Sequence, residues 1–201
     1  MSVCVFVEGG GPHAKTQTAC RKAFRLFFEK ALGDLQGFRV EASGSRDEAY
    51  RDFCRSLDDN SGTFPILLVD SEDPVPAGRN ARAHLQDHDK HWTRAIPDEQ
   101  VHLMVQCMEA WFLADIQAVV LYYERQFKES ALSGNPNIEA IPKQDVMNKL
   151  HNATRATSKG PYHKTRHGFD ILERIDPGRV RQRSVHADAL FTFLATLPGR
   201  V

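Results

Sequence analysis

Apolar and polar positions follow two different periods along the first half of the chain. Short apolar runs predict buried strands, and they cover Ser2–Val7, Phe38–Ala42, Phe64–Val69 and His102–Gln106. Between the first three runs the apolar positions take a helical period, over Lys15–Leu32 and again after a capping box formed by Ser45 and Glu48. The order β-α-β-α-β predicts an α/β fold with a parallel sheet and helices on both faces.

The second half of the chain departs from this alternation. A nearly continuous apolar stretch predicts one long, well-buried helix over Met108–Phe127. Further helices are expected at Ala81–His88, 142–156, His167–Ile175 and Val185–Leu197. We therefore expect an α/β domain over residues 1–127 and a helical C-terminal appendage over residues 128–201, packed on the first as a separate part or as one structural unit with it.

Composition is that of an ordinary globular protein, with 41% hydrophobic and 26% charged residues. The formal net charge is zero, so global charge indicates no partner. No apolar run approaches the roughly 18 residues of a membrane span, and Ser2–Val7 is too short for a signal peptide, so no membrane partner is expected. The four cysteines lack CxxC spacing, which predicts reduced thiols in a cytoplasmic protein.

Charge is distributed unevenly along the sequence. The segment Lys143–Arg183 holds ten Lys and Arg residues and four Asp and Glu residues, a local balance of +6, so the rest of the chain carries −6. This asymmetry fits an acidic metal-binding part joined to a basic part that contacts phosphates. A solvated helical surface explains the same pattern equally well.

Acidic residues follow two of the apolar strands. Glu8 comes directly after the first strand, and Asp70, Glu72 and Asp73 come after the third. Carboxyl ends of parallel strands build sites at one rim of a sheet, and clustered carboxylates need a cation. Extended residues at i and i+2 point to the same side, so Asp70 and Glu72 are the expected pair, with Asp73 in reserve. Hard oxygen ligands suit Mg²⁺ or Mn²⁺.

Three further features are candidates for the same site. Gly9, Gly10 and Gly11 after Glu8 leave room for a phosphate and offer N–H groups to it, although a surface turn is the alternative. Glu109 follows the fourth strand in an apolar context, where it is either a site residue or an acid at a helix N-terminus. The loop 161–167 groups cationic side chains around Tyr162, which suits phosphate contacts and stacking or a solvated basic loop.

The arrangement of strand, Glu-Gly, helix, strand, helix and strand-Asp-x-acid resembles the Toprim domain of topoisomerases, primases and related nucleases. Longer stretches resemble a bacterial family, domain of unknown function 4276, over essentially the full chain. The matching stretches are 7–11, 44–49, 68–74, 102–115 and 162–164. The resemblance implies a Mg²⁺-dependent nuclease with Glu8 as the acid/base and Asp70 with Glu72 as the metal pair. Related proteins are often encoded beside ATPases in anti-phage systems.

In the basic loop, Lys164 would stabilise charge on the phosphoryl group, Lys164 and Arg166 would contact the nucleic-acid backbone, and His163 would bind phosphate. Two departures stand out. Glu72 replaces the Asp found in many Toprim members, and no acid follows soon after Glu8, so a second metal ion would need Glu109 or Asp115.

Three functions therefore remain open on the sequence alone. The first is phosphodiester hydrolysis of DNA or RNA. The second is a catalytically silent subunit that docks on an ATPase partner. The third is hydrolysis of small phosphorylated molecules, which would need a closed pocket. Whether the protein forms a homodimer is also left open.

Overall fold

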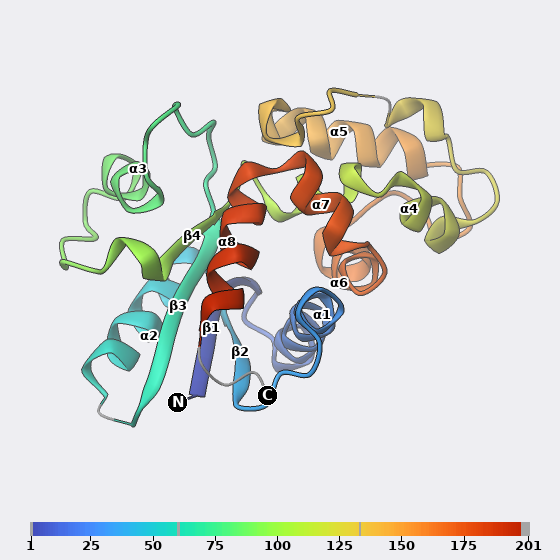
Figure 1. Cartoon of the computed structure of the whole chain (residues 1–201). Helices are drawn as coiled ribbons and strands as arrows, with labels where there is room; N and C mark the ends of the chain where they lie inside the picture. The colour runs from blue at the N-terminus through green and yellow to red at the C-terminus, as the bar shows by residue number, and fades with distance from the viewer. Residues whose placement is uncertain (1, 60, 133, 198–201) are drawn as a thin grey trace.

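A four-stranded, wholly parallel sheet forms the centre of this computed structural model, which describes residues 2–59, 61–132 and 134–197. The strand order is β2-β1-β3-β4 (Figure 1). The strands are β1 Ser2–Gly10, β2 Phe38–Gly44, β3 Thr63–Asp70 and β4 Val101–Met104. The prediction of an α/β fold with a parallel sheet is confirmed. Because β1 and β3 are direct neighbours, the ends of these two strands lie side by side.

Helices α1 (Ala14–Leu32) and α2 (Arg46–Asp58) cover opposite faces of the sheet. Odd-numbered positions of β1, such as Val5, belong to the core that includes α1, whereas Phe6 belongs to the core that includes α2. This alternation is the period-two pattern of a strand buried on both sides. The capping box at Ser45 is present as predicted.

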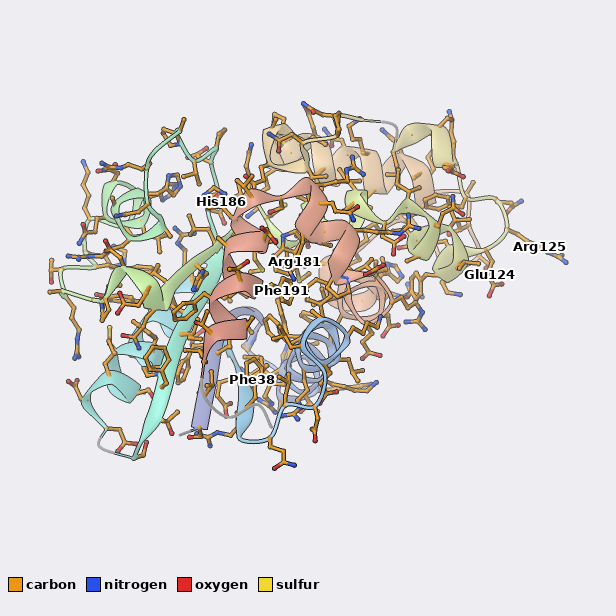
Figure 2. The ribbon with its side chains drawn as sticks, in the orientation of Figure 1. Phe38, Glu124, Arg125, Arg181, His186 and Phe191 are labelled. Atoms are coloured by element: carbon orange, nitrogen blue, oxygen red, sulfur yellow. The ribbon has the colours of Figure 1, made fainter. Side chains whose placement is uncertain are left out.

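Of the C-terminal helices, α6 (Phe169–Leu172), α7 (Pro177–Arg183) and α8 (Val185–Thr196) pack on the α1 face of the sheet. Helix α5 (Lys143–Thr154) packs instead against the segments Met108–Ala114 and Glu129–Ala131. The ring centroid of Phe28 on α1 lies 5.4 Å from that of Phe38 and 5.8 Å from that of Phe191 on α8. Phe38 and Phe191 are labelled in Figure 2. One apolar core thus joins both ends of the chain, and the division near residue 127 stays a prediction.

The long helix predicted over Met108–Phe127 is wrong. The structure has a 3₁₀ helix at Met108–Ala114 followed by a separate α-helix, α4, at Ile116–Tyr123. Asp115 separates the two helices, because its side chain accepts a hydrogen bond from the Ala118 N–H and so caps the start of α4. Glu124, which lies at the outer end of α4 in Figure 2, ends the helix with a φ of 63°. The prediction of deep burial holds for the 3₁₀ segment.

The remaining elements are short. Helix α3 spans Ala81–His88 as predicted, and 3₁₀ turns occur at Asp98–Gln100, Glu129–Ala131 and Ile138–Ala140. The helix expected over His167–Ile175 instead begins with a π-helical turn at Lys164–Gly168 and continues as α6. Helix α7 was not predicted. Among the described residues, no helix is long and apolar enough to cross a membrane.

Candidate metal and phosphate site

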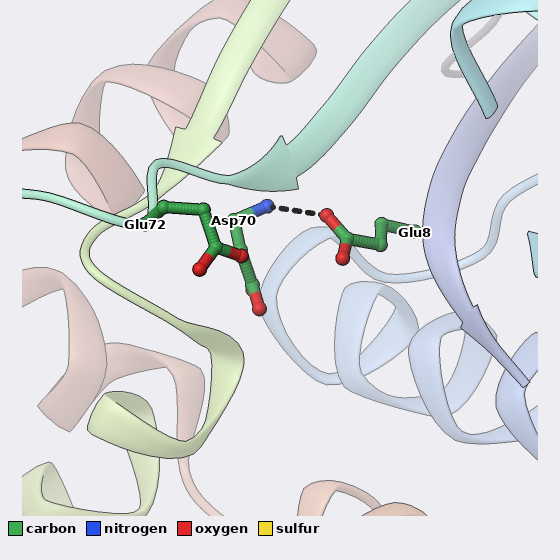
Figure 3. Close-up of side chains that lie close together, drawn as sticks. All are labelled: Glu8, Asp70 and Glu72. Atoms are coloured by element: carbon green, nitrogen blue, oxygen red, sulfur yellow. Dashed lines mark hydrogen bonds between the residues drawn. The ribbon is translucent and has the colours of Figure 1, made fainter. Parts of the chain in front are cut away.

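Three carboxylates from β1 and β3 meet at the carboxyl edge of the sheet. The backbone N–H of Asp70 donates to Glu8 Oε2 at 3.2 Å, and Glu72 follows two residues later (Figure 3). One oxygen of each of the three side chains lies within 4.8 Å of the others. The sequence prediction that Glu8 and the Asp70–Glu72 pair would come together is confirmed, and the cause is the direct pairing of β1 with β3.

Asp70 is the most deeply buried of the three acids, at 1% exposure. Its Oδ1 accepts a 2.8 Å hydrogen bond from the Met108 N–H, which fixes the orientation of the carboxylate. Arg46 donates from its guanidinium to the Asp70 carbonyl oxygen and to Asp89 Oδ2, the latter at 2.6 and 3.0 Å. Side chain and backbone of Asp70 are therefore both held in place.

Two lysines from the basic C-terminal segment reach the carboxylates. The ammonium of Lys143 lies 2.7 and 2.8 Å from the two oxygens of Glu72, and that of Lys164 lies 3.5 Å from Asp70 Oδ2. Burial lowers the pKa of each lysine, but the neighbouring acids outweigh it and raise both pKa values above their ordinary range. Both ammonium groups are therefore charged at neutral pH.

Glu109 contacts Lys164 and does not belong to the group formed by Glu8, Asp70 and Glu72. It is fully buried, accepts a 2.9 Å hydrogen bond from the Tyr162 hydroxyl, and places Oε2 3.9 Å from the Lys164 ammonium. Among the described residues, Oε2 has no hydrogen-bond partner. Burial raises the pKa of Glu109, and Asp70 adds to this effect. A buried carboxylate with an unpaired oxygen indicates a local shortage of positive charge or of donors.

Glu8 is a second carboxyl group of the site whose ionised form is disfavoured. Burial, together with the charge of Asp70, raises the pKa of Glu8 to about 7, although Lys164 and Arg46 oppose the shift. A carboxyl group with a pKa near neutrality both accepts and donates a proton at physiological pH, as a general acid or base must.

Glu8→Gln is expected to stabilise the protein in EDTA at pH 8. Because the folded-state pKa is raised, the folded chain holds a proton between about pH 4.5 and 7 that the unfolded chain has released. Ionising Glu8 thus lowers the free energy of unfolding by up to roughly 3 kcal/mol as pH rises through this window. Thermal melts should show the variant above the wild type at pH 8 and level with it below pH 4.5. A variant less stable at pH 8 would contradict this reading.

Two of the three glycines after Glu8 let α1 approach the sheet closely. A Cβ added to Gly10 would stand 2.7 Å from Cα of Gln17, and one added to Gly9 would stand 3.0 Å from Sγ of Cys20. An added Cβ on Gly11 meets no atom of the described chain within 4 Å. Packing thus explains Gly9 and Gly10, and phosphate contact by the three glycines stays a prediction.

The other predicted residues lie at the margin of the carboxylate group. Asp73 is 69% exposed on its side chain and faces His88 Nε2 at 3.4 Å. His163 and Arg166 are exposed on the turn that carries Lys164. Asp115, the alternative ligand, instead caps α4 and accepts from the Asp176 N–H at 2.9 Å.

The sequence matches the family described as a domain of unknown function (DUF4276) over residues 7–195. The chain belongs to this family. The DUF4276 match takes in every carboxylate and lysine of the site, from Glu8 to Lys164. No curated protein and no solved structure matches the chain.

Sequence reasoning missed two residues of this DUF4276 site. Lys143 had one usable signal: it occupies the first position of α5, where the helix dipole disfavours a cation unless an acid compensates. Arg46, in the first turn of α2, carries the same signal and also stacks over the ring of Trp92 at 5.4 Å. In both cases the compensating acid lies far away in sequence, at Glu72 and Asp89.

Proposed function

We propose that this protein hydrolyses phosphodiester bonds of nucleic acid with the help of Mg²⁺ or Mn²⁺. The observation that carries the proposal is the meeting of Glu8, Asp70 and Glu72 at the carboxyl edge of a parallel sheet, with Lys164 beside them. The order of strand ends resembles that of Toprim nucleases. The conclusion rests on the geometry and charge of these side chains.

The donor set fits a hard divalent cation. All three side chains offer carboxylate oxygens, which Mg²⁺ and Mn²⁺ prefer, and their spacing allows each to contribute an oxygen to one ion. With Glu109, four carboxyl groups face two ammonium groups. Burial and the charge of Asp70 raise the pKa of Glu8, and Oε2 of Glu109 has no hydrogen-bond partner among the described residues. A divalent cation held by the carboxylates would stabilise their ionised forms.

Each residue would have a distinct part in hydrolysis. Asp70 and Glu72 would hold the ion, which when bound polarises a phosphoryl oxygen and activates a water molecule. Glu8, which lies beside the Asp70–Glu72 pair and accepts the Asp70 N–H, would take the proton of the attacking water. Lys164 would face the negative charge that develops on the phosphoryl group. Glu109, held by the Tyr162 hydroxyl, would position the Lys164 ammonium.

The basic C-terminal segment favours a polyanionic substrate. Both site lysines belong to Lys143–Arg183, where the local charge balance is +6, and Arg166 is exposed next to Lys164. Cations around a cleavage site attract a phosphate backbone without reading its sequence. This arrangement suits DNA or RNA better than a small phosphorylated molecule.

A catalytically silent binding subunit of an ATPase complex is the second candidate. The Lys143–Glu72 ion pair favours it, because this pair satisfies one of the three carboxylates without any metal ion. Under this alternative the acidic cluster would be structural, and an ATPase partner would supply the chemistry.

A cleavage assay separates the candidates. Single-stranded DNA, duplex DNA, tRNA and mononucleotides are each incubated with the protein in Mg²⁺, Mn²⁺ or EDTA, with and without the product of a neighbouring gene. We expect metal-dependent cleavage of a polynucleotide. Hydrolysis of mononucleotides alone would contradict a nucleic-acid substrate. An absence of cleavage under every condition would favour the silent subunit.

A further inference from the structure

The ammonium group of Lys143 contacts the same carboxylate oxygens that would bind a metal ion. Its ammonium donates to both oxygens of Glu72, at 2.7 and 2.8 Å, and lies 3.5 Å from Asp70 Oδ2. These are the two side chains proposed to hold the ion, and Figure 3 shows both on the same side of the strand end. The lysine therefore supplies one positive charge where a divalent cation would supply two.

Gln106 fixes both members of this ion pair. Its carbonyl oxygen accepts from the Glu72 N–H at 3.0 Å, and its side-chain oxygen accepts from the Lys143 N–H at 3.1 Å. Gln106 is itself buried and donates to the Glu139 carbonyl at 3.1 Å. Glu72 takes a φ of 66°, which is uncommon outside glycine. Backbone hydrogen bonds to Gln106 thus hold the two residues of the ion pair next to each other.

We propose that Lys143 competes with the divalent ion for Glu72 and so sets the metal affinity of the site. This inference rests on the proposed function, because it requires that Asp70 and Glu72 bind a metal ion. A cation beside two metal ligands repels an incoming cation and engages their oxygens. The ammonium must leave Glu72 before both oxygens of that side chain are free.

The exposure of the pair makes this exchange feasible in the folded protein. The side chains of Lys143 and Glu72 are 29% and 32% exposed, so the ammonium has solvent to move into. Asp70, at 1%, is not exposed and keeps its contact with Lys164. A lysine side chain leaves an ion pair by rotamer change within nanoseconds, without local unfolding.

Binding of Mn²⁺, followed by the electron paramagnetic resonance signal of the free ion, tests the inference without any activity readout. Lys143→Met and Lys143→Gln are each expected to bind Mn²⁺ at least about tenfold more tightly than the wild type, because both lack the competing charge. Lys143→Arg keeps the charge and should bind no more tightly than the wild type.

Lys128→Met is the matched control. Lys128 is exposed, and its N–H bonds the Ala153 carbonyl, ten residues along α5 from Lys143 and so roughly 15 Å away. Its affinity for Mn²⁺ should equal that of the wild type. Thermal melts of all variants check folding, and the Gln variant keeps a donor for Glu72 if the Met variant unfolds.

Two results would overturn the inference in distinguishable ways. If the wild type binds Mn²⁺ and both uncharged Lys143 variants bind it equally or more weakly, Lys143 does not compete with the ion, and the proposed function stands. If neither the wild type nor these variants bind Mn²⁺, the metal site fails, and the inference fails with it.

Discussion

Asp70→Asn is expected to lower metal-dependent cleavage by at least ~10³-fold, because a bound metal ion contributes several kcal/mol to charge stabilisation in such reactions. The substitution replaces the central carboxylate while keeping an oxygen that accepts the Met108 N–H. The change therefore removes charge rather than packing. Cleavage rate and Mn²⁺ binding are measured on the same preparation, with a thermal melt to confirm folding.

Asp73→Asn is the matched control for Asp70→Asn. It makes the same chemical change three residues away, at an acid that is 69% exposed and faces His88 rather than the carboxylate group. We expect cleavage within about twofold of the wild type, as for surface substitutions away from a site. Full activity in Asp70→Asn, or equal losses in the two variants, would refute the metal-site account.

Lys164→Met is expected to lower kcat by about 10²–10³-fold, the range seen when one charge-stabilising group is removed. The ammonium sits 3.5 Å from Asp70 Oδ2 and 3.9 Å from Glu109 Oε2, at 37% exposure, so one side remains open to a phosphate. The substitution should leave Mn²⁺ binding intact or make it tighter, because it removes a repelling cation. Single-turnover cleavage and Mn²⁺ titration together measure the two effects.

Lys164→Arg and Arg166→Gln complete this test. Lys164→Arg keeps the charge and should retain part of the kcat that Lys164→Met loses. Arg166 is exposed on the same turn, so Arg166→Gln should raise KM with kcat little changed. A Lys164→Met protein with normal kcat would show that Lys164 serves only to neutralise the buried acids.

The carboxylate half of the site could be predicted because it depends on local patterns. Glu8 and Asp70 each follow an apolar run, and the β-α-β-α-β order places the ends of parallel strands at one rim. The direct pairing of β1 with β3 then brings the two acids into contact. A sequence pattern was sufficient here, since strand period and crossover handedness leave few arrangements.

Only one of the two lysines could be predicted. Lys164 was a candidate because of the basic loop 161–167, whereas Lys143 was missed. Their contacts with Asp70 span 94 and 73 residues, and no local period encodes such a contact. The 3₁₀ segment Met108–Ala114 shows the same limit, because its apolar composition indicates burial but not helix type. The side chain of Asp115 caps α4 and separates it from the 3₁₀ helix, a boundary that the apolar composition of the segment did not indicate.

Anomalous X-ray scattering from crystals soaked in Mn²⁺ tests the central claim most directly. The account predicts a peak in contact with carboxylate oxygens of Asp70 and Glu72, beside Glu8, and loss of that peak in Asp70→Asn crystals grown and soaked in the same way. A wild-type map with no peak at these three residues, from crystals that cleave nucleic acid when dissolved in Mn²⁺, would contradict it.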